Sequence, residues 1–196
     1  MKLKEGKIVA GVSARHLHLS EADLKVLFGE NAQLTPIKDL GQPGQFASDE
    51  KVKVMGPKGE FESVRVLGPV RSDTQVEVSL TDAYKLGVVP PVRDSGDIEG
   101  TPGVTLIGPA GEVILEKGLI LAKRHIHMTP EDAQFFDVKD KDIVSVLCDT
   151  QGRKTIFQDV LIRVSPKYAL EFHVDTDEAN ASFLKTGDEV QIIKEL

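Results

Sequence analysis

The sequence predicts a mainly β protein made of two small β-barrel domains that are related by an internal repeat, with a few short α-helices. Three observations support this fold class: short strand-like runs separated by Gly, Pro and Asp turns, one segment that occurs twice, and few helix-like stretches. With 196 residues and 40% hydrophobic content, the chain can bury one sizeable core or two small ones. We place the domains at residues 1–92 and 93–196.

The repeat is clearest where ARHLHLSEADLKVLFG at 14–29 returns as KRHIHMTPEDAQFFDV at 123–138. The arginine, both histidines and the aspartate five residues after the second histidine are identical between the copies. The runs before them, IVAGVSARHLHL and VILEKGLILAKRHIHM, are rich in β-forming residues. Each copy is therefore expected to contain a strand that carries His-x-His.

A helix should begin directly after each His-x-His strand. Ser20 and Thr129 are good N-caps, and each has an aspartate three residues later. Pro130 stands at the first helical position, where its missing N–H costs nothing. These signals predict helices over 21–28 and 130–136.

The later part of each copy corresponds more loosely. TQVEVSLTDAYKLG at 74–87 matches LEFHVDTDEANASF at 170–183. The first copy has extra residues near LTPIKDLGQPGQFAS, at 34–48, which we interpret as an active-site loop, although a plain surface loop fits the composition equally well. GPKG at 56–59 predicts a hairpin turn, and PPVRDSGDIEGTPG at 90–103 is the expected junction of the domains.

All five histidines fall at repeated positions. Residues two apart on a strand share a face, so each His-x-His can direct two imidazoles at one metal ion. The match of 74–87 with 170–183 supplies a third candidate ligand to each pair. Alternatively, these histidines are hydrogen-bonded strand residues that bind no metal. The predicted sets are His16, His18 and Glu77 in the first domain, and His125, His127 and His173 in the second. Three-ligand sets of this kind are typical of catalytic zinc, so we predict two zinc ions per chain.

The charge balance limits the partners. The chain has 31 acidic and 24 basic residues, a formal charge of −7, which argues against a nucleic-acid or membrane partner. An anionic substrate therefore needs a local basic cluster, for which Arg15, Arg124, Arg65 and Arg93 are candidates, whereas Lys58 is expected to be an ordinary surface charge. Arg71 is the strongest candidate, because GPVRSD places it on a turn that leads toward Glu77 and a guanidinium can bind phosphate through two parallel hydrogen bonds.

The single cysteine and the lengths of the apolar runs indicate the compartment and limit the cysteine chemistry. The single cysteine, Cys148, cannot form an intrachain disulfide, and IVSVLC reads as a buried strand, which disfavours an acyl-cysteine route. No run is long and apolar enough to span a membrane. We therefore expect a cytoplasmic protein and leave its oligomeric state open.

A series of motifs covering nearly the whole chain resembles the PduL-type phosphate propanoyltransferases. In chain order the motifs are SARHLHLS, QPGQF, VRVLGPVRSDTQVE, PPVRDSG, RHIHM and HVDTDEANA. The resemblance implies two β-barrel domains with a pair of zinc ions where they meet, held by the two ligand sets above. It also implies exchange of the coenzyme A of a short acyl-CoA, propanoyl-CoA or acetyl-CoA, for inorganic phosphate, which gives acyl phosphate. Members housed in bacterial microcompartments usually carry a targeting segment, but here the first barrel is expected directly after MKLKEGK, so encapsulation is not indicated.

The same resemblance implies roles for individual residues. Arg71 would bind phosphate. Coenzyme A would contact Ala14, Arg15, His16, Pro57, Val64 and Asn180.

Two other functions compete with this interpretation. A dinuclear metallohydrolase would use hydroxide in place of phosphate, but it commonly needs a bridging Asp or Lys, and the repeat offers no acidic ligand beyond Glu77. A non-catalytic scaffold stabilised by metal is the other alternative. The open three-ligand sets with neighbouring arginines argue against it.

Overall fold

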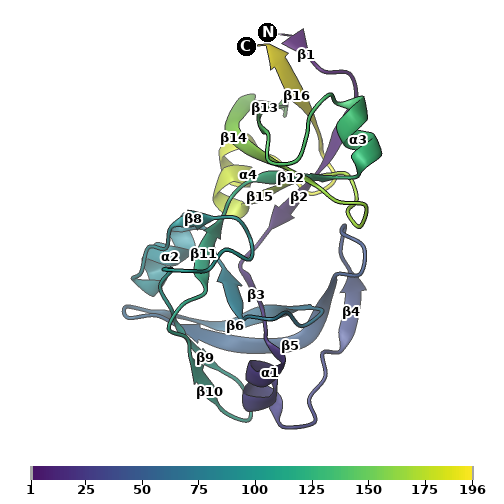
Figure 1. Cartoon of the computed structure of the whole chain (residues 1–196). Coiled ribbons are helices and arrows are strands. Elements are labelled where there is room, and N and C mark those ends of the chain that lie inside the picture. Colours follow the sequence, from purple (N-terminus) through teal and green to yellow (C-terminus); the bar gives the residue numbers. More distant parts are fainter. Residues whose placement is uncertain (1, 196) are drawn as a thin grey trace. The chain divides into compact units, whose positions relative to one another are not determined.

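The computed structural model describes residues 2–195, which contain sixteen strands and four short helices (Figure 1). The chain forms two compact units, each with its own sheet and core. Unit 1 comprises the chain up to Ser13, Gly41–Pro43 and the chain from Lys123 onward, whereas unit 2 comprises Ala14–Leu40 and Gly44–Ala122. The predicted mainly β fold with two barrel-like domains is confirmed.

Unit 1 is a closed barrel of six strands. The strands follow the order β16-β13-β14-β12-β15-β2, and the pairing of β2 with β16 closes the ring, with β1 added beside β16. Closure leaves no long unpaired edge within the ring. Its strands are β1 Lys2–Leu3, β2 Ile8–Ser13, β12 His125–Met128, β13 Ile143–Cys148, β14 Thr155–Val164, β15 Glu171–Asp175 and β16 Glu189–Glu195.

Unit 2 contains an open sheet that forms a half-barrel. Its strands follow the order β10-β9-β5-β6-β3-β7-β11-β8, and β4 pairs with β5. The predicted hairpin turn joins β5 to β6, where Gly56 N–H donates to the carbonyl of Gly59 over 2.9 Å. Its strands are β3 His16–His18, β4 Pro36–Asp39, β5 Phe46–Met55, β6 Glu60–Gly68, β7 Gln75–Glu77, β8 Val92–Arg93, β9 Thr105–Ile107, β10 Glu112–Ile114 and β11 Leu119–Ala122.

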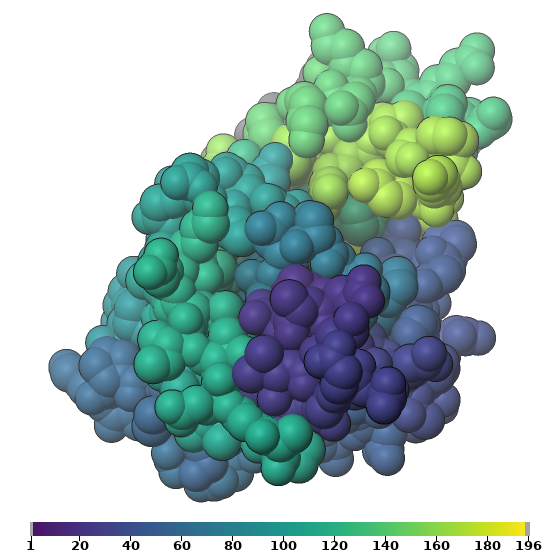
Figure 2. Space-filling model, turned by 60° about the horizontal axis from the view of Figure 1, so that its bottom comes forward, coloured from purple at the N-terminus to yellow at the C-terminus, as the bar shows by residue number. Residues whose placement is uncertain are grey.

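Two helices follow the His-x-His strands as predicted. Helix α1 (Glu21–Phe28) is capped by Ser20, and α3 (Pro130–Phe135) is capped by Thr129. In unit 2, α1 packs against the β9–β10 hairpin, where the N–H of Ala110 donates to the carbonyl of Leu27 over 2.9 Å. Figure 2 shows this face, with the purple α1 region beside the teal-green hairpin.

Two further helices were not predicted. Helix α2 (Leu80–Leu86) follows β7, and α4 (Thr176–Ser182) follows β15, so they too occupy repeated positions. Both begin with a capping box, formed by Ser79 with Asp82 and by Asp175 with Glu178. This spacing of a cap and an acidic residue three positions later is the sequence signal that could have predicted them.

The two units do not coincide with the segments 1–92 and 93–196, because the repeats exchange their first strands. Strand β2 precedes the first His-x-His but pairs with β15 in unit 1. Strand β11 precedes the second His-x-His but pairs with β7 in unit 2. Consequently, 90–103 lies inside unit 2, and the chain leaves that unit for the last time after Ala122.

Each unit has a separate apolar core. The core of unit 1 includes the fully buried Phe172, Ile126 and Ile162, and that of unit 2 includes Leu17 and Val76. Ile126 and Leu17 are the middle residues of the two His-x-His sequences, so each pair of histidines points away from the core side of its strand. Among the described helices, none combines the length and apolar character needed to cross a membrane.

Candidate metal centres

Strand pairing in unit 2 brings the first predicted ligand set together. His16 lies directly opposite Glu77 on the antiparallel pair β3–β7, and His18 shares the face of His16. Ligand atoms of the three residues all lie within 4.8 Å of one another. We call His16, His18 and Glu77 the first centre.

Unit 1 repeats this arrangement on β12 and β15. His125 lies directly opposite His173, as His16 lies opposite Glu77. The ligand nitrogens of His125, His127 and His173 also lie within 4.8 Å of one another. We call these three residues the second centre.

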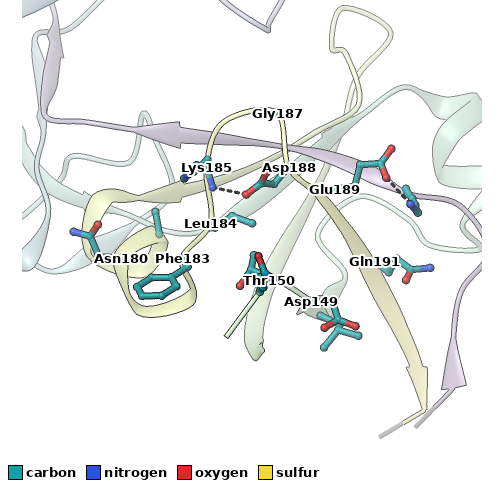
Figure 3. A pocket seen from close by; sticks show the side chains of 14 residues that line it. Asp149, Thr150, Asn180, Phe183, Leu184, Lys185, Gly187, Asp188, Glu189 and Gln191 are labelled. Carbon is teal, nitrogen blue, oxygen red and sulfur yellow. Dashed lines mark hydrogen bonds and ion pairs between the residues drawn. The ribbon is translucent and has the colours of Figure 1, made fainter. Parts of the chain in front are cut away.

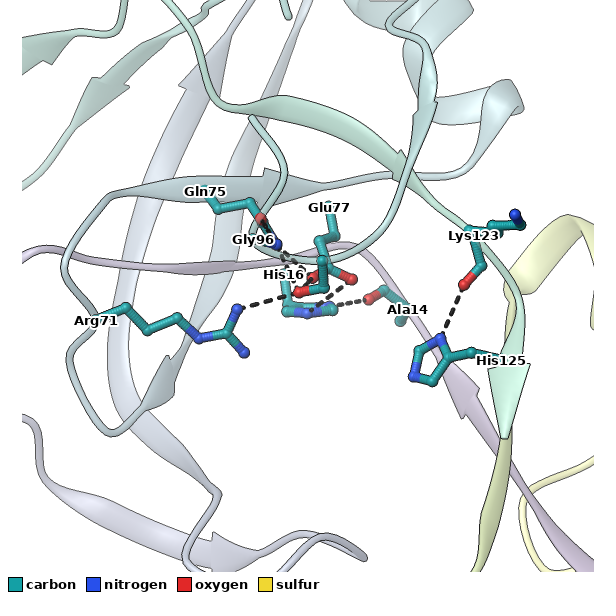
Figure 4. Close-up of polar contacts among 9 residues, drawn as sticks. Ala14, His16, Arg71, Gln75, Glu77, Gly96, Lys123 and His125 are labelled. Atoms are coloured by element: carbon teal, nitrogen blue, oxygen red, sulfur yellow. Dashed lines mark hydrogen bonds and ion pairs between the residues drawn. The ribbon is translucent and has the colours of Figure 1, made fainter. Parts of the chain in front are cut away.

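Backbone carbonyls fix the tautomers of two histidines in the same way. Nδ1 of His16 donates to the carbonyl of Ala14 over 2.9 Å, and Nδ1 of His125 donates to that of Lys123 over 2.8 Å (Figure 4). A carbonyl only accepts, so Nε2 of each ring retains its lone pair. Metal-binding histidines characteristically donate their other ring N–H in this manner.

Three further ring nitrogens have no hydrogen-bond partner among the described residues. They are the buried Nδ1 atoms of His18 and His127 and Nε2 of His173. An unsatisfied buried polar atom costs about 1 to 3 kcal/mol, so a fold retains one where a ligand can satisfy it. Both centres therefore fit a divalent metal ion with open coordination positions.

Burial keeps His18 and His125 neutral near pH 7. Desolvation, reinforced by the charges of Arg71 and His16, lowers the pKa of His18 to about 3. Desolvation also lowers the pKa of His125 to about 3, with a further contribution from His173. Neutral imidazole is the form that binds metal, so these rings need no deprotonation near pH 7.

Glu77 is held as a carboxylate by its surroundings. Burial alone would raise its pKa, but the neighbouring His16 and His18 and a hydrogen bond from Ser95 lower it overall. Oγ of Ser95 donates to Oε1 of Glu77 over 2.8 Å, and the side-chain amide of Gln75 donates to the same oxygen over 2.6 Å. These contacts orient the carboxylate.

Arg71 lies beside the first centre, at the position expected from sequence. Its guanidinium donates to Oγ of Ser95 over 3.1 Å, and it contributes to lowering the pKa values of His18 and Glu77. In Figure 4 its side chain extends toward the cluster formed by His16, Glu77 and Gln75. The first centre thus combines candidate metal ligands with a guanidinium suited to an anion.

Arg15 and Arg124 have structural partners instead. Arg15 forms a 2.8 Å ion pair with Asp82 in α2, and Arg124 forms a 2.7 Å ion pair with Glu178 in α4. Each guanidinium also lies over a phenylalanine ring, with Arg15 4.2 Å from the centre of the Phe61 ring. The two arginines, each directly before a His-x-His strand, thus contact the helices α2 and α4, which follow the third-ligand strands β7 and β15.

The residues implied for coenzyme A binding are distributed over both units. Ala14, Arg15 and Pro57 are exposed in unit 2, and the first two directly precede the buried His16 in the chain. Val64 is only 2% exposed and packs in the core of that unit. Any contact from Val64 would therefore use its backbone. Asn180 is exposed on α4 in unit 1.

Asn180 lines an open groove of about 1200 Å³ in unit 1 (Figure 3). Lys7 and Lys185 lie on its walls, but Asp149, Asp188 and Glu189 outnumber them. This balance makes the groove a poor site for a strongly anionic ligand.

Several residues beside the centres were not singled out from sequence. Gln75 and Glu171 lie two positions before the third ligands, so the period of a strand could have placed them on the ligand face. The others are Ser95 at the first centre and Gln42, Arg163 and Tyr168 near the second. Gln42 and Ser95 belong to the motifs QPGQF and PPVRDSG, whereas Arg163 and Tyr168 gave no distinct signal.

The single cysteine lies apart from this chemistry. Cys148 is buried in the core of unit 1, and burial raises its pKa to about 12. A thiol with so high a pKa is a poor nucleophile near pH 7. The expectation that Cys148 lies buried in a strand is confirmed.

The fold and the centres define a two-unit β protein with repeated His-rich sites, and comparison with known proteins gives its family. The family model for phosphate propanoyltransferase matches residues 9–185. A phosphate propanoyltransferase of Thermotoga maritima is 63% identical over 191 residues, which cover 97% of this chain and 91% of that protein. Proteins of the same name from Priestia megaterium and Enterococcus faecalis are 56% and 53% identical, over 90% and 93% of this chain and 81% and 86% of their own lengths. The chain belongs to the phosphate propanoyltransferase family.

Proposed function

We propose that this chain is a metal-dependent phosphate acyltransferase that converts a short acyl-CoA and inorganic phosphate into acyl phosphate and coenzyme A. Phosphate acyl transfer follows from the family, whereas the metal dependence, two zinc ions per chain and the residue roles are our proposals. The observation that carries them is the pair of repeated three-ligand centres, one of which has Arg71 beside it.

The reaction requires one bond to form as another breaks. A phosphate oxygen attacks the thioester carbonyl carbon, the carbon–sulfur bond breaks, and coenzyme A departs as a thiolate that takes up a proton. Bound divalent ions would supply Lewis acidity for the carbonyl and charge stabilisation for the thiolate.

Arg71 would orient the phosphate. Its planar guanidinium can donate two parallel hydrogen bonds to phosphate oxygens, and the contact with Ser95 limits where it can point. Holding phosphate next to the thioester removes much of the entropic cost of bringing two reactants together, about 7 kcal/mol or more in well-oriented systems. The attack is direct, because Cys148 has neither the exposure nor the pKa of a nucleophile.

Coenzyme A would bind beside the first centre. The exposed residues Ala14 and Arg15 precede His16, and Pro57 lies at the tip of the β5–β6 hairpin. The Arg15 guanidinium is held by Asp82, so it can present the remaining N–H groups in a fixed direction. Asn180 is the candidate in unit 1, where the acidic groove beside it would favour contact with an uncharged part of coenzyme A over its phosphates.

Measurement of coenzyme A release tests this function. Purified protein should release coenzyme A from acetyl-, propanoyl- or butanoyl-CoA only when phosphate is present, and acyl phosphate should form in equal amount. Release at the same rate without phosphate would indicate a thioester hydrolase and overturn the proposal. Comparison of the three substrates would also give the preferred acyl chain length.

A further inference from the structure

The two centres differ at two positions that the strand register makes equivalent. The residue opposite His18 is Gln75, and the residue opposite His127 is Glu171. The first centre has a carboxylate, Glu77, among its three candidate ligands. The second centre has three imidazoles, and its carboxylate lies at this flanking position instead. Each centre thus has one nearby carboxylate, which is the third ligand itself in the first centre and lies two residues before the third ligand in the second.

Unit 1 is shaped to hold the Glu171 carboxylate. A Cβ on Gly11 would lie 2.6 Å from one of its oxygens, and a Cβ on Gly41 would lie 2.4 Å from the other. The side-chain amide of Gln42 donates to Oε2 of Glu171 over 2.9 Å and also to the carbonyl of Ala169 over 3.0 Å. A larger residue at either glycine would displace the carboxylate.

The contact between Glu171 and His173 suggests what the carboxylate does. Oε2 of Glu171 lies 2.9 Å from Nε2 of His173, yet that nitrogen makes no hydrogen bond of acceptable geometry. Nε2 of His173 is one of the two ring nitrogens of the second centre that have no hydrogen-bond partner among the described residues. Its lone pair and the Glu171 carboxylate would repel each other unless a cation or a proton lay between or beside them. The side chain of Glu171 is only 14% exposed, so water screens this charge poorly.

We propose that Glu171 is the charge-balancing carboxylate of the second metal centre and strengthens the binding of a divalent cation by His125, His127 and His173. This inference rests on the proposed metal centres. Glu171 positions His173 and raises the affinity of the second centre for a cation. Gln42, Gly11 and Gly41 hold the Glu171 carboxylate beside His173. Removal of comparable partners around metal ligands typically lowers metal affinity about 10- to 100-fold.

The alternative is that Glu171 only anchors Gln42. Glu171→Gln separates the two roles, because an amide carbonyl still accepts the hydrogen bond from Gln42 while the negative charge is lost. Gly41→Ala provides a second variant, which keeps the charge and moves the carboxylate. Glu189→Gln is the matched control, since it removes one exposed carboxylate of unit 1 that pairs with Lys7 and belongs to neither ligand group.

Zinc affinity measured by competition with a chromogenic chelator provides the test. A His18→Ala background weakens the first centre, so that the remaining tight site is the second. There, Glu171→Gln should weaken zinc binding about 10- to 100-fold, Gly41→Ala should weaken it in the same direction, and Glu189→Gln should leave it unchanged. Circular dichroism and melting temperature of the metal-free proteins verify that each variant is folded.

The outcomes separate this inference from the function it rests on. Zinc bound tightly by the parent and equally tightly by Glu171→Gln would refute the role of Glu171 and leave the metal centres standing. Absence of tight zinc binding by the unmodified protein would refute the metal centres, and the role of Glu171 with them.

Discussion

At the scale of single residues, His18 and His127 each combine burial with an unsatisfied ring nitrogen. His127 shows both most clearly, since Nδ1 has no hydrogen-bond partner in the described part of the chain and burial lowers its pKa to about 2. His125 and His173 reinforce this shift through their charges. Such a ring destabilises the metal-free fold in acid and is ready to bind a cation near neutral pH.

The stability of the metal-free protein should therefore fall as the pH falls from 6.5. His18, His125 and His127 have lower pKa values in the folded than in the unfolded chain, so the unfolded chain binds more protons below the ordinary value of 6.5. Each would contribute a loss of up to ~1.4 kcal/mol per pH unit below that value. Urea unfolding after chelator treatment, at pH 7, 6 and 5, measures the effect.

His127→Gln provides the control for this pH dependence. It removes one of the shifted groups, so its free energy of unfolding should depend less steeply on pH than that of the unmodified protein. Identical slopes would mean that His127 is protonated in the folded chain.

Arg71→Lys should raise the apparent KM for phosphate and change that for acyl-CoA much less. Lysine keeps the charge but loses the two parallel hydrogen bonds, a loss of about 1 to 3 kcal/mol, or roughly 5- to 150-fold in KM. Steady-state kinetics with either substrate varied gives the comparison, with the exposed Arg153→Lys as control. An unchanged KM for phosphate would place Arg71 outside the phosphate site.

At the scale of elements, the repeat predicted the parts that depend on local sequence. The His-x-His strands, the N-caps Ser20 and Thr129 and the helices after them lie where expected, because capping and strand alternation are short-range effects. Helices α2 and α4 were not predicted, since their short apolar patterns are weak and only their capping boxes mark them. The partner of Arg124 was likewise beyond sequence reasoning, because Glu178 lies on a distant element.

Arg124→Met should lower stability and leave phosphate kinetics unchanged. Burial raises the pKa of Glu178, and Arg124 is the cation that offsets this cost. Loss of the 2.7 Å ion pair leaves a largely buried carboxylate without its charge partner, which we expect to cost about 1 to 3 kcal/mol. Melting temperature and KM for phosphate provide the two readouts.

A raised KM for phosphate with unchanged stability would contradict this assignment. Arg124 would then act on the substrate, as its place next to His125 first indicated.

At the scale of the whole molecule, the exchange of first strands was the feature that the sequence could not predict. A self-comparison shows that β2 and β11 are equivalent, but not that each pairs with the third-ligand strand of the other repeat. Pairing between β-strands distant in the chain leaves no local sequence signal. The same exchange places Gly11 beside Glu171, so it contributes to the surroundings of the second centre.

The two centres should be required together. His18→Ala and His127→Ala should each reduce phosphate-dependent release of coenzyme A by orders of magnitude, because each removes a ligand of a different metal ion that the reaction needs. Both proteins should stay folded, since the cores are built from apolar residues of the other strand face. Circular dichroism accompanies the rate measurement.

About half the activity in either variant would point to two independent centres. In that case each unit would carry out the reaction alone, and the repeat would have doubled a site instead of creating one that needs two metals.

Metal removal followed by stepwise reloading tests the central claim most directly. Chelator-treated protein should release no coenzyme A from propanoyl-CoA and phosphate, and activity should return as zinc is added, with its maximum at two equivalents per chain. Two equivalents are expected because two three-ligand groups are present within the described residues. Full activity in the metal-free protein, or a maximum reached at one equivalent, would contradict the account.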